Sequence, residues 1–156
     1  MSAQLNYGYS TPKAVAGAKV DLSHDEVVTR MNEAEDGKLM YGMAVMVGTN
    51  PGQTVAVPNG ATAAQIEGVA LCHPNTEQDR NGKVIVKKDT SVGVMVKGRI
   101  WGRLATGVTP TYRAKAYVVV SGADAGCFTT ASEGTVDINA TFGNATDEGI
   151  AVVELN

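Results

Sequence analysis

Hydrophobic and polar positions alternate along much of this chain, and a period of two is typical of half-buried β-strands. The clearest case is TVDINATFG at 135–143, where the even-numbered residues are hydrophobic and most residues between them are polar. Two segments, YGMAVMV at 41–47 and AKAYVVVSG at 114–122, are apolar on both faces. They predict covered strands, and GIAVVEL at 149–155 predicts the last strand.

Turn residues separate these segments. Asn81-Gly82 precedes KVIVK at 83–87, and Asn59-Gly60 separates TVAVP from ATAAQIEGVAL. Asn-Gly is the strongest two-residue hairpin signal, so we expect a hairpin at each place. GTNPGQT at 48–54 predicts a turn between two strands, because it lacks the Gly-Lys-Ser/Thr ending of a phosphate loop. Roughly nine short strands result, which predicts an all-β fold: a compact antiparallel β-barrel or sandwich-like domain with an N-terminal arm.

The stretch VGVMVKGRIWGRL at 92–104 alternates like a strand and contains the only tryptophan of the chain, Trp101. No residue in it suits proton transfer, metal binding or phosphate binding. Trp101 therefore has two interpretations: it is part of the core, or it anchors a protein–protein contact, where tryptophan is enriched.

Residues 1–39 carry few large hydrophobic side chains, so we expect an N-terminal arm there and a β-rich domain over residues 40–156. Ser23 followed by Glu26 fits a capping box, which would begin a short helix. The β-branched pair Val27 and Val28 favours an extended segment instead. In either form, an arm that cannot bury itself needs a neighbouring subunit to lie on, or it remains mobile.

Composition and charge exclude several classes of protein. A length of 156 residues predicts one domain, and the net charge is only −3. Its longest basic cluster is Lys87–Lys88, which gives no electrostatic footprint for nucleic acid or for a membrane surface. The N-terminus lacks the pattern of a secretory signal. Cys72 and Cys127 are expected to be two reduced thiols of a protein made in the cytoplasm; a single disulfide is the alternative.

Candidate chemistry is weak everywhere. His24 beside Asp25 and His73 beside Cys72 lack the spaced partners of a zinc site. A Cys72 nucleophile with His73 as its base is disfavoured, because neighbouring residues of a strand point to opposite faces, although a cavity lined by both would argue for it. We therefore expect no catalytic residue, no metal, no cofactor and no enzymatic activity.

Several segments, in their order along the chain, resemble the capsid cement, or decoration, proteins of tailed bacteriophages. GAKVDLSHDEVVTRMNEAED resembles the N-terminal segment of that family, with its Thr-Arg-x-Asn-Glu core at residues 29–33. YGMAVMVG at 41–48 is similar to its Tyr/Phe-Gly-x-Ala-Val-x-x-Gly strand, although Met43 stands where the family commonly has a basic residue. The other segments are IEGVAL, DTSVGVMVKGRIW, KAYVVVSGADAGCFT and GIAVVEL.

The resemblance implies a β-rich protein on the outer surface of the mature phage head that stabilises it by bridging capsid subunits. Its partners would be the major capsid protein and copies of itself, as trimers on the capsid, with no nucleic acid and no membrane. The candidate capsid or inter-protomer contacts are Asp21, Asp25, Val28, Arg30, Asn32 and Trp101. Two alternatives remain: another virion part, such as a tail or fibre adhesin that binds host glycan, and a small β-barrel enzyme or ligand carrier.

Overall fold

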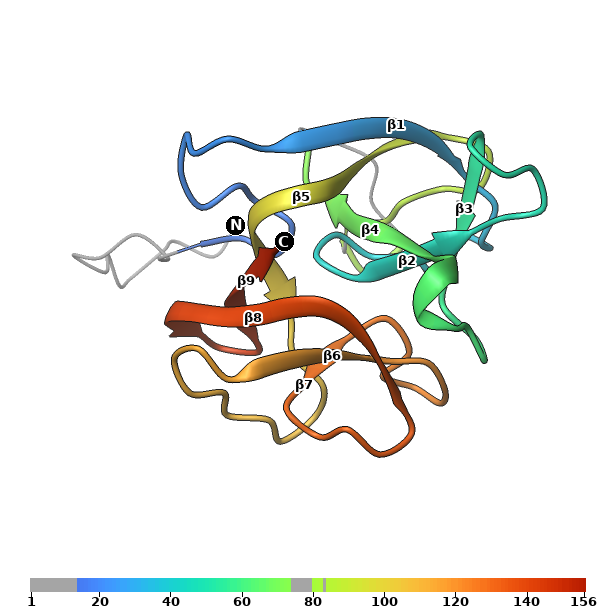
Figure 1. The fold of residues 1–156 in the computed structure, drawn as a ribbon. Coiled ribbons are helices and arrows are strands. Elements are labelled where there is room, and N and C mark those ends of the chain that lie inside the picture. The colour runs from blue at the N-terminus through green and yellow to red at the C-terminus, as the bar shows by residue number, and fades with distance from the viewer. Residues whose placement is uncertain (1–13, 74–79, 83) are drawn as a thin grey trace.

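The computed structural model describes residues 14–73, 80–82 and 84–156, which are built almost entirely of β-strands (Figure 1). Within these ranges there is no α-helix, and η1 (Ala63–Gln65) is a single 3-10 turn. The strands in chain order are β1 (Glu26–Asn32), β2 (Ala44–Val47), β3 (Thr54–Ala56), β4 (Ile66–Leu71), β5 (Ser91–Arg103), β6 (Lys115–Val119), β7 (Phe128–Thr129), β8 (Thr135–Asp147) and β9 (Ile150–Leu155). The predicted all-β class is therefore confirmed.

Five strands of the described chain close into a small barrel. Their order is β1-β3-β2-β4-β5, and β5 pairs again with β1 to complete the ring. Neighbouring strands are antiparallel except β1 and β3, which run parallel. One cluster of buried side chains belongs to this part of the fold: Leu39, Tyr41, Val45, Val55, Ala70, Val86, Val92 and Val94. Closure removes the exposed backbone edge that an open sheet would present.

A second sheet continues from the other half of β5, in the order β5-β9-β8-β6-β7. An isolated parallel bridge between Leu104 and Phe128 connects its last strand back to the end of β5. The largest core cluster combines Phe128 and Phe142 from this sheet with Val69 and Met95 from the barrel wall. Full burial of each such side chain contributes about 1.5–3 kcal/mol, so this shared core holds the two parts together.

Strand β5 belongs to both parts. Its first half pairs with β1 and β4, and residues 98–103 pair with β9. Gly98 stands at the joint with a φ of 126°, a conformation that residues with a Cβ rarely adopt. A Cβ there would also lie 2.8 Å from the Cβ of Asp25. Glycine is thus required where the strand passes from one sheet to the other.

Part of the segment 1–39 lies in the barrel wall. Because β1 pairs with both β5 and β3, the chain adopts the extended alternative there, and not the helical one. Upstream, the backbone N–H of Gly17 donates to the Trp101 carbonyl at 2.7 Å, and that of Trp101 donates to Ala18 at 3.0 Å. A Cβ on Gly17 would lie 2.9 Å from the nitrogen of Gly42. This close packing fixes the place at which the chain enters the folded body.

Two strand and hairpin predictions need correction. Residues 84–87, the described part of the strand predicted at 83–87, form only a single bridge at Val84. Val86 is nevertheless buried, and its carbonyl accepts a hydrogen bond from Gly37 at 3.2 Å, so turn contacts replace a ladder here. The strand before Asn81-Gly82 would fall on residues outside the described ranges.

The second Asn-Gly pair, at 59–60, does not form a hairpin. The strands on its two sides, β3 and β4, both pair with β2 and not with each other. The turn at 48–53 does join β2 and β3 as an antiparallel pair, as predicted.

The joint in β5 gives a first prediction. Gly98→Ala should lower the free energy of unfolding by about 1–3 kcal/mol, because alanine is strained at this φ and its Cβ meets Asp25. Urea denaturation followed by circular dichroism measures the change. Gly93→Ala in the same strand is the matched control. Its φ is ordinary and its new Cβ would meet nothing closer than 3.5 Å, so its stability should be unchanged or higher. Equal losses in the two variants would contradict this account of the joint.

Candidate functional site

The Thr-Arg-x-Asn-Glu segment is built into the barrel by polar contacts. In β1, Val28, Arg30 and Asn32 are buried or half-buried, and the residues between them are exposed. Arg30 reaches across to Glu67 of β4, with Nε and Nη2 each 2.5 Å from Oε1. Only 19% and 12% of these two side chains are exposed, and Glu67 Oε2 is buried without a partner among the described residues. Removing one member of such a buried pair typically costs about 3–5 kcal/mol, so Arg30 is important for the fold itself.

Asn32 is fully buried, and its amide joins three parts of the chain. Its Oδ1 accepts a hydrogen bond from the Ala34 backbone at 2.9 Å, and its Nδ2 donates to the Lys87 carbonyl at 3.0 Å. Its backbone N–H and C=O bond to Thr90 and Asp89. Asn32 therefore ties the end of β1 to the irregular segment before β5.

Glu33 lies over the turn between β2 and β3. Its carboxylate accepts hydrogen bonds from the Thr49 backbone N–H at 2.6 Å and from the Thr49 hydroxyl. Gly48 makes room for it, since a Cβ there would overlap the carboxylate. Hydrogen bonds from the Thr49 side chain, which have the largest effect, and from the Thr54 side chain hold the pKa of Glu33 below its ordinary value. Two separate segments of the resemblance, 29–33 and 41–48, thus meet in one structural unit.

The two candidate acids lie in the segment that leads into β1. Asp21 Oδ2 is 2.6 Å from Arg99 Nη1, and Asp25 Oδ2 is 2.6 Å from Lys19 Nζ. Hydrogen bonds from Ser23, and then the charge of Arg99, hold the pKa of Asp21 below its usual value. Exposed pairs of this kind contribute about 0–1 kcal/mol, so both acids remain available for external contacts at little cost to the fold.

Trp101 is part of the core of the isolated chain. Only 7% of its surface is exposed, and it packs in a cluster with Ala16, Ile150 and Val152. Among the candidate contacts, the structure thus leaves Asp21 and Asp25 with accessible side chains and encloses Asn32 and Trp101. Contact of any of the six with another protein stays a prediction.

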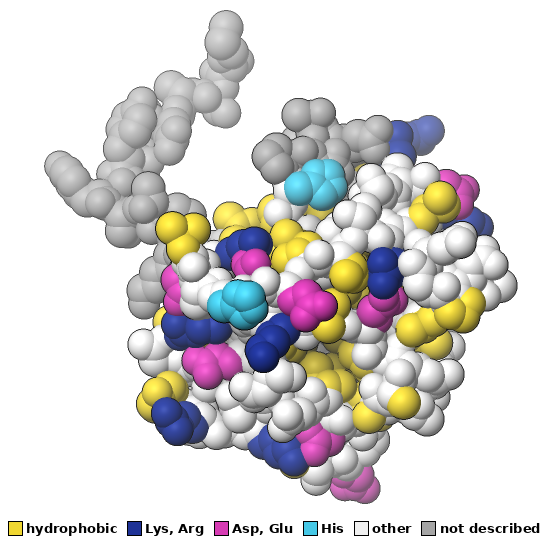
Figure 2. Space-filling view, turned by 45° about the horizontal axis from the view of Figure 1, so that its top comes forward, with side chains coloured by type: hydrophobic (Ala, Val, Ile, Leu, Met, Phe, Trp, Pro, Cys, Tyr) yellow, Lys and Arg dark blue, Asp and Glu magenta, His cyan; other side chains and the backbone are white. Residues whose placement is uncertain are grey.

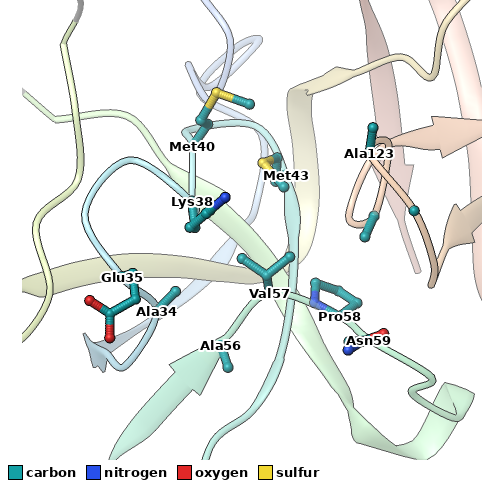
Figure 3. A pocket seen from close by; sticks show the side chains of 12 residues that line it. Ala34, Glu35, Lys38, Met40, Met43, Ala56, Val57, Pro58, Asn59 and Ala123 are labelled. Carbon is teal, nitrogen blue, oxygen red and sulfur yellow. The ribbon is translucent and has the colours of Figure 1, made fainter.

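One hollow, of about 600 Å³, lies between residues 34–43, residues 56–59 and the loop at 122–125 (Figure 3). Methionine, alanine, valine and proline make up most of its wall, with Glu35 and Lys38 at one side. None of the six candidate contacts lines it. In the part of the chain that the structure describes, Glu35 and Lys38 are the only charged side chains that line this hollow, and they do not form an arrangement typical of a catalytic site.

A second hollow, of about 500 Å³, is lined by Cys72 and His73 together with Tyr41 and Arg103. The thiol donates weakly to the His73 carbonyl at 3.9 Å, and His73 Nε2 is 3.2 Å from the Tyr41 hydroxyl. These contacts do not pair the thiol with the imidazole. Burial raises the pKa of Cys72, which keeps the thiol protonated near neutral pH, and a nucleophile needs the opposite. The cavity is present, but its groups are not arranged for covalent catalysis.

The remaining chemical features of the described residues are few. Cys72 and Cys127 are both free thiols. No group of three or more His, Cys, Asp or Glu side chains in the described ranges could hold a metal ion. Within the same ranges, no helix has the length and apolar character to cross a membrane.

Comparison with known proteins gives the family. The family described as structural cement protein (E217 gp24/Pam3 gp6) matches residues 3–156, so this chain belongs to the phage structural cement proteins. It accordingly decorates and stabilises a bacteriophage capsid, and its place is the virion capsid.

One solved structure, described as the capsid of Myoviridae Phage XM1, contains a chain of the same fold, with a TM-score of 0.78 and 16% identity. The alignment covers 100% of this chain and 98% of that one. No curated protein matches the sequence.

The Glu33 contacts give a second prediction. Glu33→Gln should lower the free energy of unfolding at pH 7 by about 0.5–1 kcal/mol, because the charge-assisted hydrogen bonds from Thr49 weaken. Since the folded-state pKa is lowered, this stabilisation is complete above the ordinary value of about 4.3 and disappears as the pH falls through the folded value. The two proteins should therefore converge in denaturant titrations once the pH falls through the lowered folded-state pKa of Glu33.

Glu133→Gln, at an exposed position, is the control and should leave stability unchanged at either pH. A Glu33→Gln deficit that persists undiminished in acid would show that the carboxylate charge is not its source.

Proposed function

We propose that this cement protein binds the outer surface of the mature head, contacts the major capsid protein and bridges neighbouring subunits without enzymatic activity. We further propose that it occurs there as trimers. Membership of the cement protein family carries the proposal. The closed barrel and the shared core support it, because a bridge between subunits needs a body that does not deform.

Two of the proposed contacts, Asp21 and Asp25, lie in the segment that leads into β1. Asp25 pairs with Lys19, and Asp21 pairs with Arg99, which also contacts Glu154 at 3.2 Å, so this segment has a polar surface of paired charges. Val28, Arg30, Asn32 and Trp101 would act mainly by holding that surface in place. The segment before Ala14 is proposed to be the part of the arm that reaches a neighbouring subunit.

Mass action explains how such binding stabilises a shell. A ligand that binds only the assembled form shifts the equilibrium toward assembly. A standard interface buries about 800 Å² on each partner, and the effect is repeated at every copy around the shell. A site formed between subunits exists only after they reach their mature arrangement. Binding should therefore discriminate between mature shells and free capsid protein, and about 10⁴-fold discrimination corresponds to about 5.5 kcal/mol.

The third prediction tests this directly. Heads stripped of the protein should lose resistance to heat and osmotic shock and regain it when the protein is added back. Binding should saturate at a fixed ratio to capsid protein and depend little on salt, because the net charge is only −3. Equal binding to unassembled capsid protein, or bound protein without a gain in particle stability, would contradict the bridging role.

The fourth prediction concerns the arm. A chain lacking residues 1–13 keeps β1 and the packing of Gly17 against Gly42, so it should unfold at the same denaturant concentration as the full chain. It should bind stripped heads at least about tenfold more weakly if the arm supplies one well-packed anchor of about 1.4 kcal/mol. Undiminished binding by the truncated chain would assign the arm another role. A cut after residue 38 is no substitute, because it removes a barrel strand.

A further inference from the structure

Gly93 is a glycine for which the isolated chain shows no need. Five glycines of the described residues have ordinary φ angles: Gly48, Gly68, Gly93, Gly102 and Gly143. At four of them a Cβ would come within 3.0 Å of another atom, so packing excludes a side chain. At Gly93 the nearest atoms to a Cβ are 3.5–3.7 Å away, which is ordinary contact. Glycine weakens a strand interior, and such a position often marks the close approach of another backbone.

Gly93 also lies in an outward-facing, uncharged strip of the barrel wall, in which apolar side chains stand beside the exposed Thr29 and Ser91. It is opposite Thr29 of β1 on one side and Leu71 of β4 on the other. The three atoms that a Cβ at this position would touch belong to Leu71 and Val27. Val27 and Met31, on the same face of β1, are 38% and 46% exposed. The missing side chain therefore leaves a shallow depression with hydrophobic rims.

The strip is electrically neutral. Its nearest charged neighbours along the strands, Glu26 and Lys97, are opposite each other in the β1–β5 ladder. The Arg30 guanidinium, on the other side of β1, already contacts Glu67. Figure 2, which brings the β1 side of the molecule forward, shows hydrophobic side chains interspersed with acidic and basic ones over this face. A charged segment would find no unpaired countercharge within the strip, so the complementary surface is apolar and uncharged.

We propose that the depression over Gly93 is a contact site for the major capsid protein. It receives an uncharged extended segment, whose apolar side chain or backbone packs between Val27 and Leu71. The inference rests on the proposed function and deepens it, because it specifies where on the barrel the capsid binds and what chemistry it presents. A contact of this kind is dry, apolar and insensitive to salt.

The fifth prediction is the test of this site. Gly93→Ala and Gly93→Val fill the depression from inside; the fold has room for the Cβ of either residue, and the γ-methyl groups of valine extend the filling further. Both proteins should have an unchanged or higher melting temperature and the same mass by light scattering as the natural chain. Their affinity for stripped heads should fall, by about tenfold to a hundredfold for valine and less for alanine, as expected when a packed contact is overfilled. The loss should be the same at low and at high salt.

Thr146→Val is the matched control, since it places the same side chain at an exposed strand position of the second sheet and should bind normally. Full binding by Gly93→Val would overturn the proposal while leaving the cement role intact. A lower melting temperature would overturn it by showing that Gly93 serves the chain's own fold. A changed mass would overturn it in favour of a contact between copies. If the natural chain itself fails to bind stripped heads, the proposed function fails, and this inference with it.

Discussion

The architecture depends on one strand that serves two sheets. A strand has two hydrogen-bonding edges, and β5 uses its first half to close the barrel and its second half to begin the other sheet. The positive φ at Gly98 reorients the strand between these halves. Met95 and Ile100, on either side of that joint, both enter the large core between barrel and sheet. Because the two parts share covalent backbone and core, neither can move without disrupting the other.

The N-terminal segment completes this arrangement. Residues 16–20 form backbone hydrogen bonds with the edge of β5 that β9 leaves free. Gly17 packs so closely against the backbone of Gly42 that a Cβ on Gly17 would lie 2.9 Å from the nitrogen of Gly42. The chain therefore leaves the body at a fixed place beside Trp101. If the residues before Ala14 contact a neighbouring subunit, as proposed above, a fixed starting point lowers the entropy that they lose on binding.

Alternation predicted the strands well and their partners poorly. Segments 41–47, 92–104, 135–143 and 149–155 each overlap a strand, because alternating or continuous hydrophobic character is a local property of the sequence. Asn-Gly indicates a turn but not which strands it joins, so β2 could insert between β3 and β4 without a sequence signal. The scarcity of hydrophobic residues before residue 40 predicts an arm. The strand in this segment contributes Arg30 and the Asn32 amide to the barrel, and such polar packing leaves no hydrophobic period to detect.

The same comparison separates residues that serve the fold from those available for function. The polar side chains of the Thr-Arg-x-Asn-Glu motif bind other parts of the same chain. Arg30 pairs with Glu67, Asn32 bonds to the backbone, and Glu33 accepts hydrogen bonds from Thr49. A motif can therefore identify a family and still mark its scaffold and not its contact surface. The contact surface is better sought where the chain has a feature that its own packing does not require. Gly93 is such a feature, because a side chain would fit there and would strengthen the strand, and yet none is present.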